Sequence, residues 1–115
     1  MKDYLYIFGF ETPPQFVDNN KFGCDYEDSS RFLIHAQDKD KAQAWGDILA
    51  KSYVEDLFKS AHADPKTAWF KGLIDEDEDG DGVDSNTRRV AYGEYFDIHA
   101  DIKKWYGGES WFLEK

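Results

Sequence analysis

The sequence predicts one α+β domain over residues 1–115, with a mostly antiparallel sheet of about four strands, one long helix packed across the sheet and a short C-terminal helix. Two patterns lead to this fold class. Apolar side chains between Tyr4 and Phe10 include an aromatic ring at every second position, which is the spacing of a β-strand. Between Asp38 and Phe58, apolar side chains recur three and four residues apart, as in an amphipathic helix. At 115 residues and 41% hydrophobic content, the chain supports one core and not two.

The first strand is predicted over Tyr4–Phe10 and is expected to lie inside the sheet, because both of its faces are apolar. One face carries Tyr4, Tyr6, Phe8 and Phe10, which we expect to form core, and the other carries Leu5 and Ile7. A second strand is predicted over Arg31–Ala36 and is expected to pair with the first. Residues 11–30 contain two adjacent prolines, an asparagine pair and a glycine, and are therefore predicted to form a long loop with turns.

The long helix is predicted to begin after an N-cap at Asp38 or Asp40 and to continue to about Phe58. Asp40 followed by Gln43 fits a variant of the capping box. Gly46 lies inside this helix, where a glycine costs about 1 kcal/mol relative to alanine. We expect this glycine to mark a close approach of the helix to the sheet.

The second half of the chain predicts two more strands and the final helix. Asp64 and Pro65 indicate a turn or a short helical start. Strands are predicted over Trp69–Ile74 and Arg89–Tyr92, joined as a long hairpin whose tip carries the acidic segment described below. The final helix is predicted over residues 97–106 and ends at Gly107, with one apolar face formed by Ile98, Ile102, Trp105 and Tyr106. Trp111 and Phe112 are expected to dock on the core.

The net charge of −10 argues against several classes of partner. Nucleic-acid binding depends on Lys and Arg side chains that neutralise phosphates, so we expect no nucleic-acid partner, and the same reasoning disfavours anionic membrane surfaces. No apolar run approaches the roughly 20 residues that span a bilayer, and the opening residues place an acid, Asp3, where a signal peptide has a basic residue. With one cysteine, Cys24, and therefore no internal disulfide, the chain is predicted to be cytoplasmic.

An acidic surface loop is predicted at residues 75–86. It contains seven of the 24 acidic residues and no basic residue before Arg88, and its acids are Asp75, Glu76, Asp77, Glu78, Asp79, Asp81 and Asp84. A run of like charges is usually a solvated surface, and it also attracts cations and cationic proteins. We expect Asp77, Asp79, Asp81 and Asp84 to steer a basic protein partner towards the chain.

The stretch DEDGDG, which begins at Asp77, resembles the opening of the calcium loops of EF-hands and dockerins. The resemblance implies a calcium ion bound by Asp77, Asp79 and Asp81, with Gly82 at the sharp turn. The next positions depart from the pattern, because Asp84 stands where those loops have an apolar residue and Arg88 stands where they have a glutamate. A register that begins at Asp75 is also incomplete. Calcium is therefore the alternative prediction, of weak affinity, and no other cofactor is expected.

Tyr26, Glu27 and Asp28 form a second acidic and aromatic candidate edge for binding a partner. The function predicted first is a small, non-catalytic, protein-binding module, comparable at the level of class to bacterial immunity proteins and other small inhibitors of basic proteins. The calcium-binding domain is the alternative, and a small enzyme is the third reading. No catalytic residues are assigned. The histidines at 35, 62 and 99 show no zinc-ligand spacing, and Cys24 with His35 is the one thiol and base pair considered.

Overall fold

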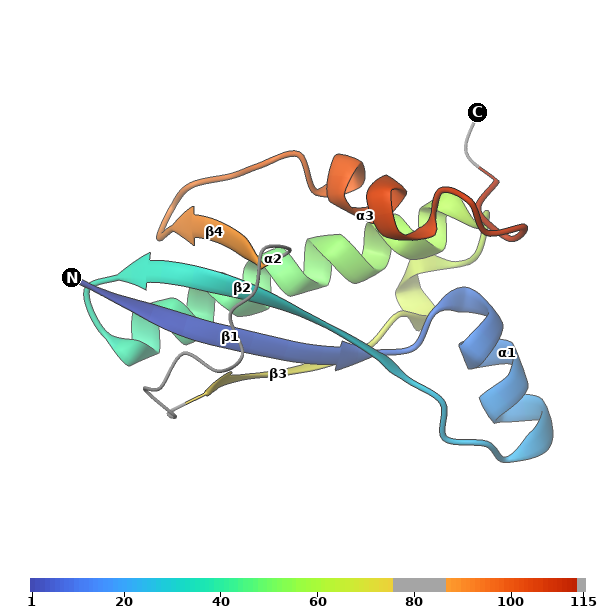
Figure 1. Cartoon of the computed structure of the whole chain (residues 1–115). Helices are drawn as coiled ribbons and strands as arrows, with labels where there is room; N and C mark the ends of the chain where they lie inside the picture. The colour runs from blue at the N-terminus through green and yellow to red at the C-terminus, as the bar shows by residue number, and fades with distance from the viewer. Residues whose placement is uncertain (76–86, 114–115) are drawn as a thin grey trace.

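The computed structural model of the chain describes residues 1–75 and 87–113 (Figure 1). Its elements in chain order are β1 (Lys2–Phe10), α1 (Pro13–Phe22), β2 (Asp28–Ala36), α2 (Lys39–Ser60), a short 3-10 helix η1 (Pro65–Thr67), β3 (Phe70–Asp75), β4 (Arg88–Ala91) and α3 (Ile98–Tyr106). The α+β class, the long helix and the short C-terminal helix are as predicted. None of the helices in these ranges is both long and apolar enough to cross a membrane.

The strands form one mixed sheet in the order β3-β1-β2-β4. β1 lies inside the sheet, as predicted, and pairs antiparallel with both β2 and β3. β4 pairs in parallel with β2, so that Val90 lies opposite Ile34. The predicted hairpin of the third and fourth strands is therefore wrong, because β3 occupies the free edge of β1 and the two strands lie at opposite edges of the sheet. A connection between neighbouring strands in the sequence does not require that they be neighbours in the sheet.

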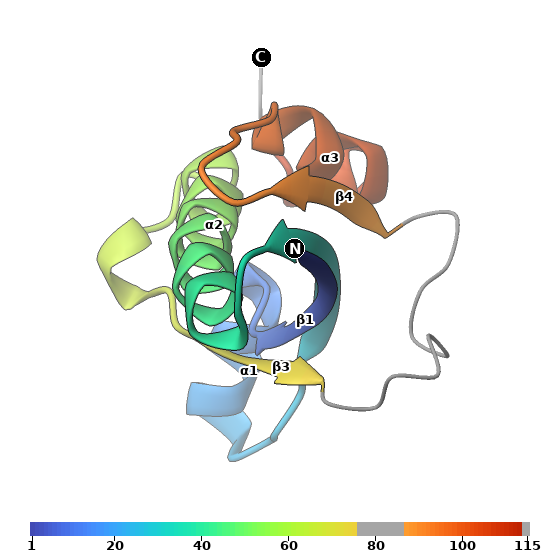
Figure 2. The ribbon, with the colours of Figure 1, turned by 90° about the vertical axis from the view of Figure 1, so that its left-hand side faces the viewer.

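The core lies between the sheet and α2, which crosses one face of it (Figure 2). The predicted aromatic face of β1 is confirmed, because Tyr6, Phe8 and Phe10 are fully buried and Tyr4 packs against them half-buried. Helix α2 contributes Leu49, Tyr53, Leu57 and others to the same cluster. Ile102 of α3 closes it, while the tail residues Trp111 and Phe112 pack against it, as predicted.

Gly46 brings α2 into contact with the sheet, which confirms the prediction for this residue. A Cβ atom at Gly46 would lie 2.3 Å from Cδ2 of Tyr6. On the other side of the Tyr6 side chain, a Cβ atom at Gly72 of β3 would lie 1.8 Å from the hydroxyl oxygen. That hydroxyl donates a hydrogen bond of 2.7 Å to Asp47. The tyrosine ring therefore fits only because both neighbouring positions lack a side chain.

The segment predicted as a loop between the first two strands contains a helix, α1, and this prediction was wrong. Thr12 caps the helix, and the side-chain oxygen of Gln15 accepts a hydrogen bond from the backbone N–H of Thr12 at 2.9 Å. The two prolines occupy the first positions of the helix, where no intrahelical N–H bond is lost. Gly23 ends α1 in the left-handed region with φ 68°. The residues that suggested turns thus mark the two ends of a helix, and β2 begins three residues before the predicted position.

Two details of α2 also differ from the sequence prediction. The N-cap is Asp38, whose side chain accepts from the N–H of Lys41 at 2.8 Å, so Asp40 does not form the proposed capping box with Gln43. Gln43 instead binds β3, donating to the carbonyl of Gly72 at 3.0 Å and accepting from the N–H of Ile74 at 3.1 Å. Its amide therefore joins α2 to the edge strand of the sheet.

Candidate functional site

The predicted partner-binding and calcium-binding residues Asp77, Asp79, Asp81 and Asp84 lie outside the described residues. The segment that contains them follows β3 and precedes β4, whereas EF-hand loops lie between two helices. Arg88, at the position of the missing glutamate, forms a bidentate hydrogen-bonded ion pair with Asp101, which raises its pKa. Within residues 1–75 and 87–113, no group of three or more His, Cys, Asp or Glu side chains is placed to hold a metal ion.

The second candidate edge, Tyr26 to Asp28, lies where the chain leaves α1 and enters β2. A hydrogen-bond network fixes this connection to the body of the protein. The side chain of Asn19 accepts from the N–H of Tyr26 at 2.9 Å and donates to its carbonyl at 2.8 Å. The same amide donates to the buried carboxylate of Glu11, which also accepts from the indole N–H of Trp69. The backbone at Tyr26 is therefore held in place before any partner binds.

Exposed aromatic and acidic side chains gather at this connection. Tyr26 is 55% exposed and Phe22, at the end of α1, is 64% exposed. Asp25 and Glu27 flank Tyr26 in the sequence and are exposed as well. The Cys24 thiol beside Tyr26 raises the pKa of its hydroxyl. We call Phe22, Asp25, Tyr26 and Glu27 the α1–β2 corner.

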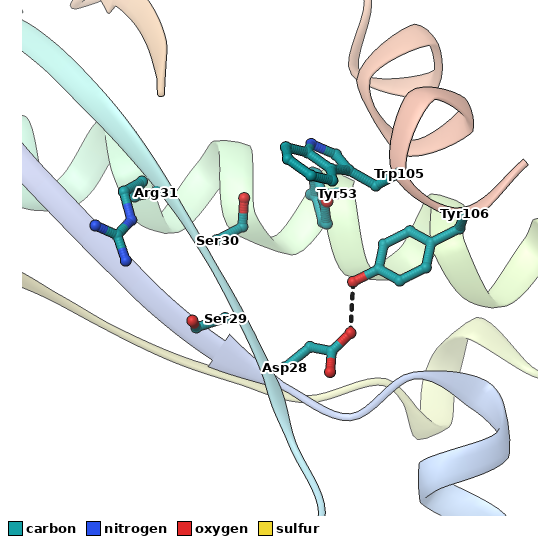
Figure 3. Close-up of a pocket in the computed structure, with 7 residues that line it drawn as sticks. All are labelled: Asp28, Ser29, Ser30, Arg31, Tyr53, Trp105 and Tyr106. Atoms are coloured by element: carbon teal, nitrogen blue, oxygen red, sulfur yellow. Dashed lines mark hydrogen bonds between the residues drawn. The ribbon is translucent and has the colours of Figure 1, made fainter. Parts of the chain in front are cut away.

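Asp28 differs from its two neighbours because its carboxylate is bound within the protein. One oxygen accepts from the side-chain amide of Gln15 in α1 at 3.0 Å. The other accepts from the hydroxyl of Tyr106 in α3 at 2.7 Å (Figure 3). Burial and this hydrogen bond raise the pKa of Tyr106, so the phenol stays a donor. Asp28 thus ties α1, β2 and α3 together, and each oxygen keeps one further lone pair for a ligand.

A pocket of about 340 Å³ lies beside Asp28, between β2 and α3 (Figure 3), and its size is at the lower end of that of ligand pockets. It is lined by Asp28, Ser29, Ser30, Arg31, Tyr53, Trp105 and Tyr106. The Trp105 side chain is 51% exposed, so its indole is accessible from the solvent. Burial, with the carboxylates of Asp101 and Asp28, raises the pKa of Tyr53 to about 12. The pocket combines an aromatic wall with hydroxyl groups and a strand edge.

This pocket was not predicted from the sequence, because Trp105 and Tyr106 were expected together on the apolar face of the last helix. Tyr106 does pack against the core, but Trp105 is half exposed. Tyr106 follows Ile102 by four residues and shares its buried face, whereas Trp105 lies about 100° from Tyr106 around the helix axis. The sequence alone does not separate Trp105 from Tyr106, because adjacent apolar residues can share a buried face, as Leu57 and Phe58 do in α2.

The histidines and the cysteine form no catalytic arrangement in the described residues. Nδ1 of His35 lies 2.7 Å from Asp3, and Nδ1 of His99 lies 2.6 Å from Asp56. Cys24 precedes β2, whereas His35 is next to its last residue. A strand rises about 3.3 Å per residue, so this strand keeps the thiol and the imidazole far beyond hydrogen-bonding distance. The hypothesis that Cys24 and His35 form a thiol and base pair is therefore wrong.

Comparison of the chain with protein-family models, with curated proteins and with solved structures gives no match.

Proposed function

We propose that the protein is a non-catalytic module that binds a basic partner protein through the α1–β2 corner. The observation that supports this most is the exposure of Tyr26 and Phe22 beside the exposed acids Asp25 and Glu27. Aromatic residues are the most frequent energetic anchors of protein interfaces, and acidic neighbours select a cationic surface. The two hydrogen bonds between the Asn19 side chain and the backbone of Tyr26 hold this residue in place, which lowers the entropy lost on binding.

We propose that the α1–β2 corner provides the affinity for the partner, whereas the acidic segment at residues 75–84 raises the association rate. Seven acids at positions 75–84 contribute most of the net charge of −10, and such a local field accelerates encounter with a cationic protein. Asp77, Asp79, Asp81 and Asp84 are proposed to steer the partner, whereas Tyr26 and Glu27 make the lasting contacts. This is the arrangement of small acidic inhibitors, such as bacterial immunity proteins, that cover a basic toxin or nuclease; the comparison is one of class alone.

The test begins with the immobilised full chain, which is used to purify partners at low salt, and continues with binding kinetics for the protein so identified. We expect a protein of high isoelectric point whose association slows steeply as salt increases. The combined change of Asp77, Asp79, Asp81 and Asp84 to Asn should lower the association rate about tenfold or more and leave dissociation almost unchanged. Tyr26→Ala should instead accelerate dissociation by at least about tenfold.

Asp40→Asn provides the matched control, because it removes one exposed negative charge at the start of α2, at the end of the molecule opposite α1 (Figure 1). It should leave dissociation within about twofold, because this charge lies far from the α1–β2 corner, and as a single charge it should slow association much less than the combined change of four residues does. A partner that binds equally well at high salt, or that is insensitive to Tyr26→Ala and to the neutralised acids, would contradict the proposal.

Calcium binding by Asp77, Asp79 and Asp81 is the alternative proposal, and it is supported by their alternating spacing in the sequence. If the ion binds the folded chain, the free energy of unfolding should rise by about 2.7 kcal/mol at a hundredfold excess over the dissociation constant. Thermal unfolding in calcium and in magnesium measures this, with the Asn variant of the same three residues as the control. An unchanged Tm in calcium at millimolar concentration would dismiss the alternative.

A further inference from the structure

The pocket beside Asp28 follows the backbone edge of β2. Side chains of a strand point alternately to the two faces of a sheet, yet the four consecutive residues 28–31 all line this pocket. A cavity that touches consecutive strand residues must lie along the edge of the strand and not above one of its faces. The other edge of β2 is paired with β1 along its whole length, so the pocket lies at the edge towards α3.

That edge of β2 is only partly covered by β4. The parallel pairing begins at Phe32 opposite Arg88 and ends at His35 opposite Ala91. Asp28, Ser29 and Ser30 precede this pairing, and no strand among residues 1–75 and 87–113 pairs with them on this side. The edge of a sheet that ends in this way presents backbone N–H and C=O groups to an incoming strand.

The direction of the backbone groups identifies Ser29 as the residue that faces the pocket edge. The carbonyl of His35 accepts from the N–H of Tyr92 at 2.8 Å, so the backbone of His35 points towards β4. Because the direction alternates along a strand, the odd-numbered residues of β2 share this orientation, and Asp28 and Ser30 point towards β1. The N–H and C=O of Ser29 are therefore directed to the side of Trp105 and Tyr106.

The walls of the pocket favour a cationic side chain. The carboxylate of Asp28 lines the pocket, and those of Asp101 and Glu109 lie near enough to raise the pKa values of Tyr53 and Tyr106. Arg31 also lines the pocket, but its guanidinium group points to the side of β2 away from Trp105 (Figure 3), and Asp101 is ion-paired with Arg88. The accessible indole of Trp105 is suited to stacking with an ammonium or guanidinium group.

We propose that an extended segment of the basic partner adds to β2 as a short strand at Asp28–Ser30, bonds to the backbone of Ser29 and places a lysine or arginine side chain against Trp105. This binding mode rests on the proposed function, because it specifies how the partner is held. Strand addition draws affinity from the backbone and specificity from the pocket that takes a side chain. The α1–β2 corner precedes this edge directly in the sequence, so one partner can contact both surfaces.

The test uses a capped hexapeptide of alternating lysine and valine, with amide spectra of the isotope-labelled full chain as the readout. We expect shifts at the amides of Ser29 and Ser30 and at the indole N–H of Trp105. The same peptide with alternate backbone nitrogens methylated keeps its charge but loses hydrogen-bond donors, and its affinity should fall about tenfold or more. A peptide with glutamate in place of lysine should not bind.

Ser29→Pro and Ser29→Ala form a matched pair of variants. Proline removes the N–H, and it is tolerated in an edge strand where that N–H faces outwards. It should weaken the lysine and valine peptide about tenfold or more while the fold is kept, whereas Ser29→Ala should bind within about twofold of the original chain. Trp105→Ala should lower affinity about fivefold.

Three results would overturn strand addition. These are no shift at Ser29 and Ser30 at millimolar peptide, equal binding by Ser29→Pro, or shifts confined to Trp105, which would indicate a side-chain site for cations alone. A failure of strand addition can be told apart from a failure of the proposed protein-binding function. A partner protein that depends on Tyr26 and on salt but is indifferent to Ser29→Pro supports the module and removes this binding mode, whereas indifference to all three removes both.

Discussion

Replacing Phe8 by alanine should lower the free energy of unfolding by about 3–5 kcal/mol, the largest loss expected from any single change considered for this chain. Phe8 is fully buried on the interior strand β1. The centroid of its ring lies 5.1 Å from that of Phe32, 5.3 Å from that of Tyr53 and 5.5 Å from that of Phe10. Alanine would leave a cavity between the sheet and α2, and these rings are too rigid to fill it.

Urea unfolding followed by circular dichroism measures this loss against a total stability of about 5–15 kcal/mol for a domain of this kind. If Phe8→Ala is too unstable to give a folded baseline, Phe8→Leu still tests the cavity, with an expected loss of about 1–2 kcal/mol. Phe22→Ala is the control, because the same side chain is 64% exposed at the end of α1 and its removal should cost no more than about 0.5 kcal/mol. A loss below about 1 kcal/mol for Phe8→Ala would contradict the packing described here.

Gly46→Ala should destabilise the protein by about 1–3 kcal/mol, although alanine is the better helix former by about 1 kcal/mol. The added methyl group would lie 2.3 Å from Cδ2 and 2.6 Å from Cγ of Tyr6. The ring cannot retreat, because Gly72 lies against its other side and its hydroxyl is bonded to Asp47. Either α2 moves away from the sheet or the hydrogen bond is lost.

A double-mutant cycle with Tyr6→Ala isolates this contact. In the Tyr6→Ala background the clash is absent, so Gly46→Ala should become stabilising by about 1 kcal/mol, the difference in helix propensity. Urea unfolding of the four forms in sucrose, which favours the compact state, keeps the weakest form measurable. Ala44→Gly, at an exposed position of α2, should cost about 1 kcal/mol in either background. An equal cost of Gly46→Ala in both backgrounds would show that the Tyr6 ring is not the obstacle.

The parts of the fold that were predicted correctly are those determined by local periodicity. The alternation in β1 and the three-to-four spacing in α2 correspond directly to buried faces, and even the close approach at Gly46 followed from one residue that did not suit its helix. The predictions failed where one residue type has two meanings. Adjacent prolines can end a helix or occupy its first turn. In α1 they occupy the first turn, because Thr12 and Gln15 form a capping box there.

The position of β4 could not be predicted from local patterns, because the sequence of Arg88–Ala91 does not determine which strand it pairs with. The same limit applies to the candidate site. Tyr26 and Glu27 were found because they adjoin in the sequence, whereas the pocket joins β2 residues to Trp105 and Tyr106 of α3, which only the tertiary fold brings together. Asp28 was selected for its charge, and its bonds to Gln15 and Tyr106 depend on the same fold.

The arrangement of the sheet has a consequence for how the chain acquires its structure. β1, β2 and β3 join through antiparallel pairings within residues 2–75, together with α2, which supplies much of the core. The parallel pairing of Ile34 with Val90 needs residues that leave the ribosome later. We therefore expect a nascent chain to form the three-stranded part first, with the edge of β2 uncovered until β4 docks.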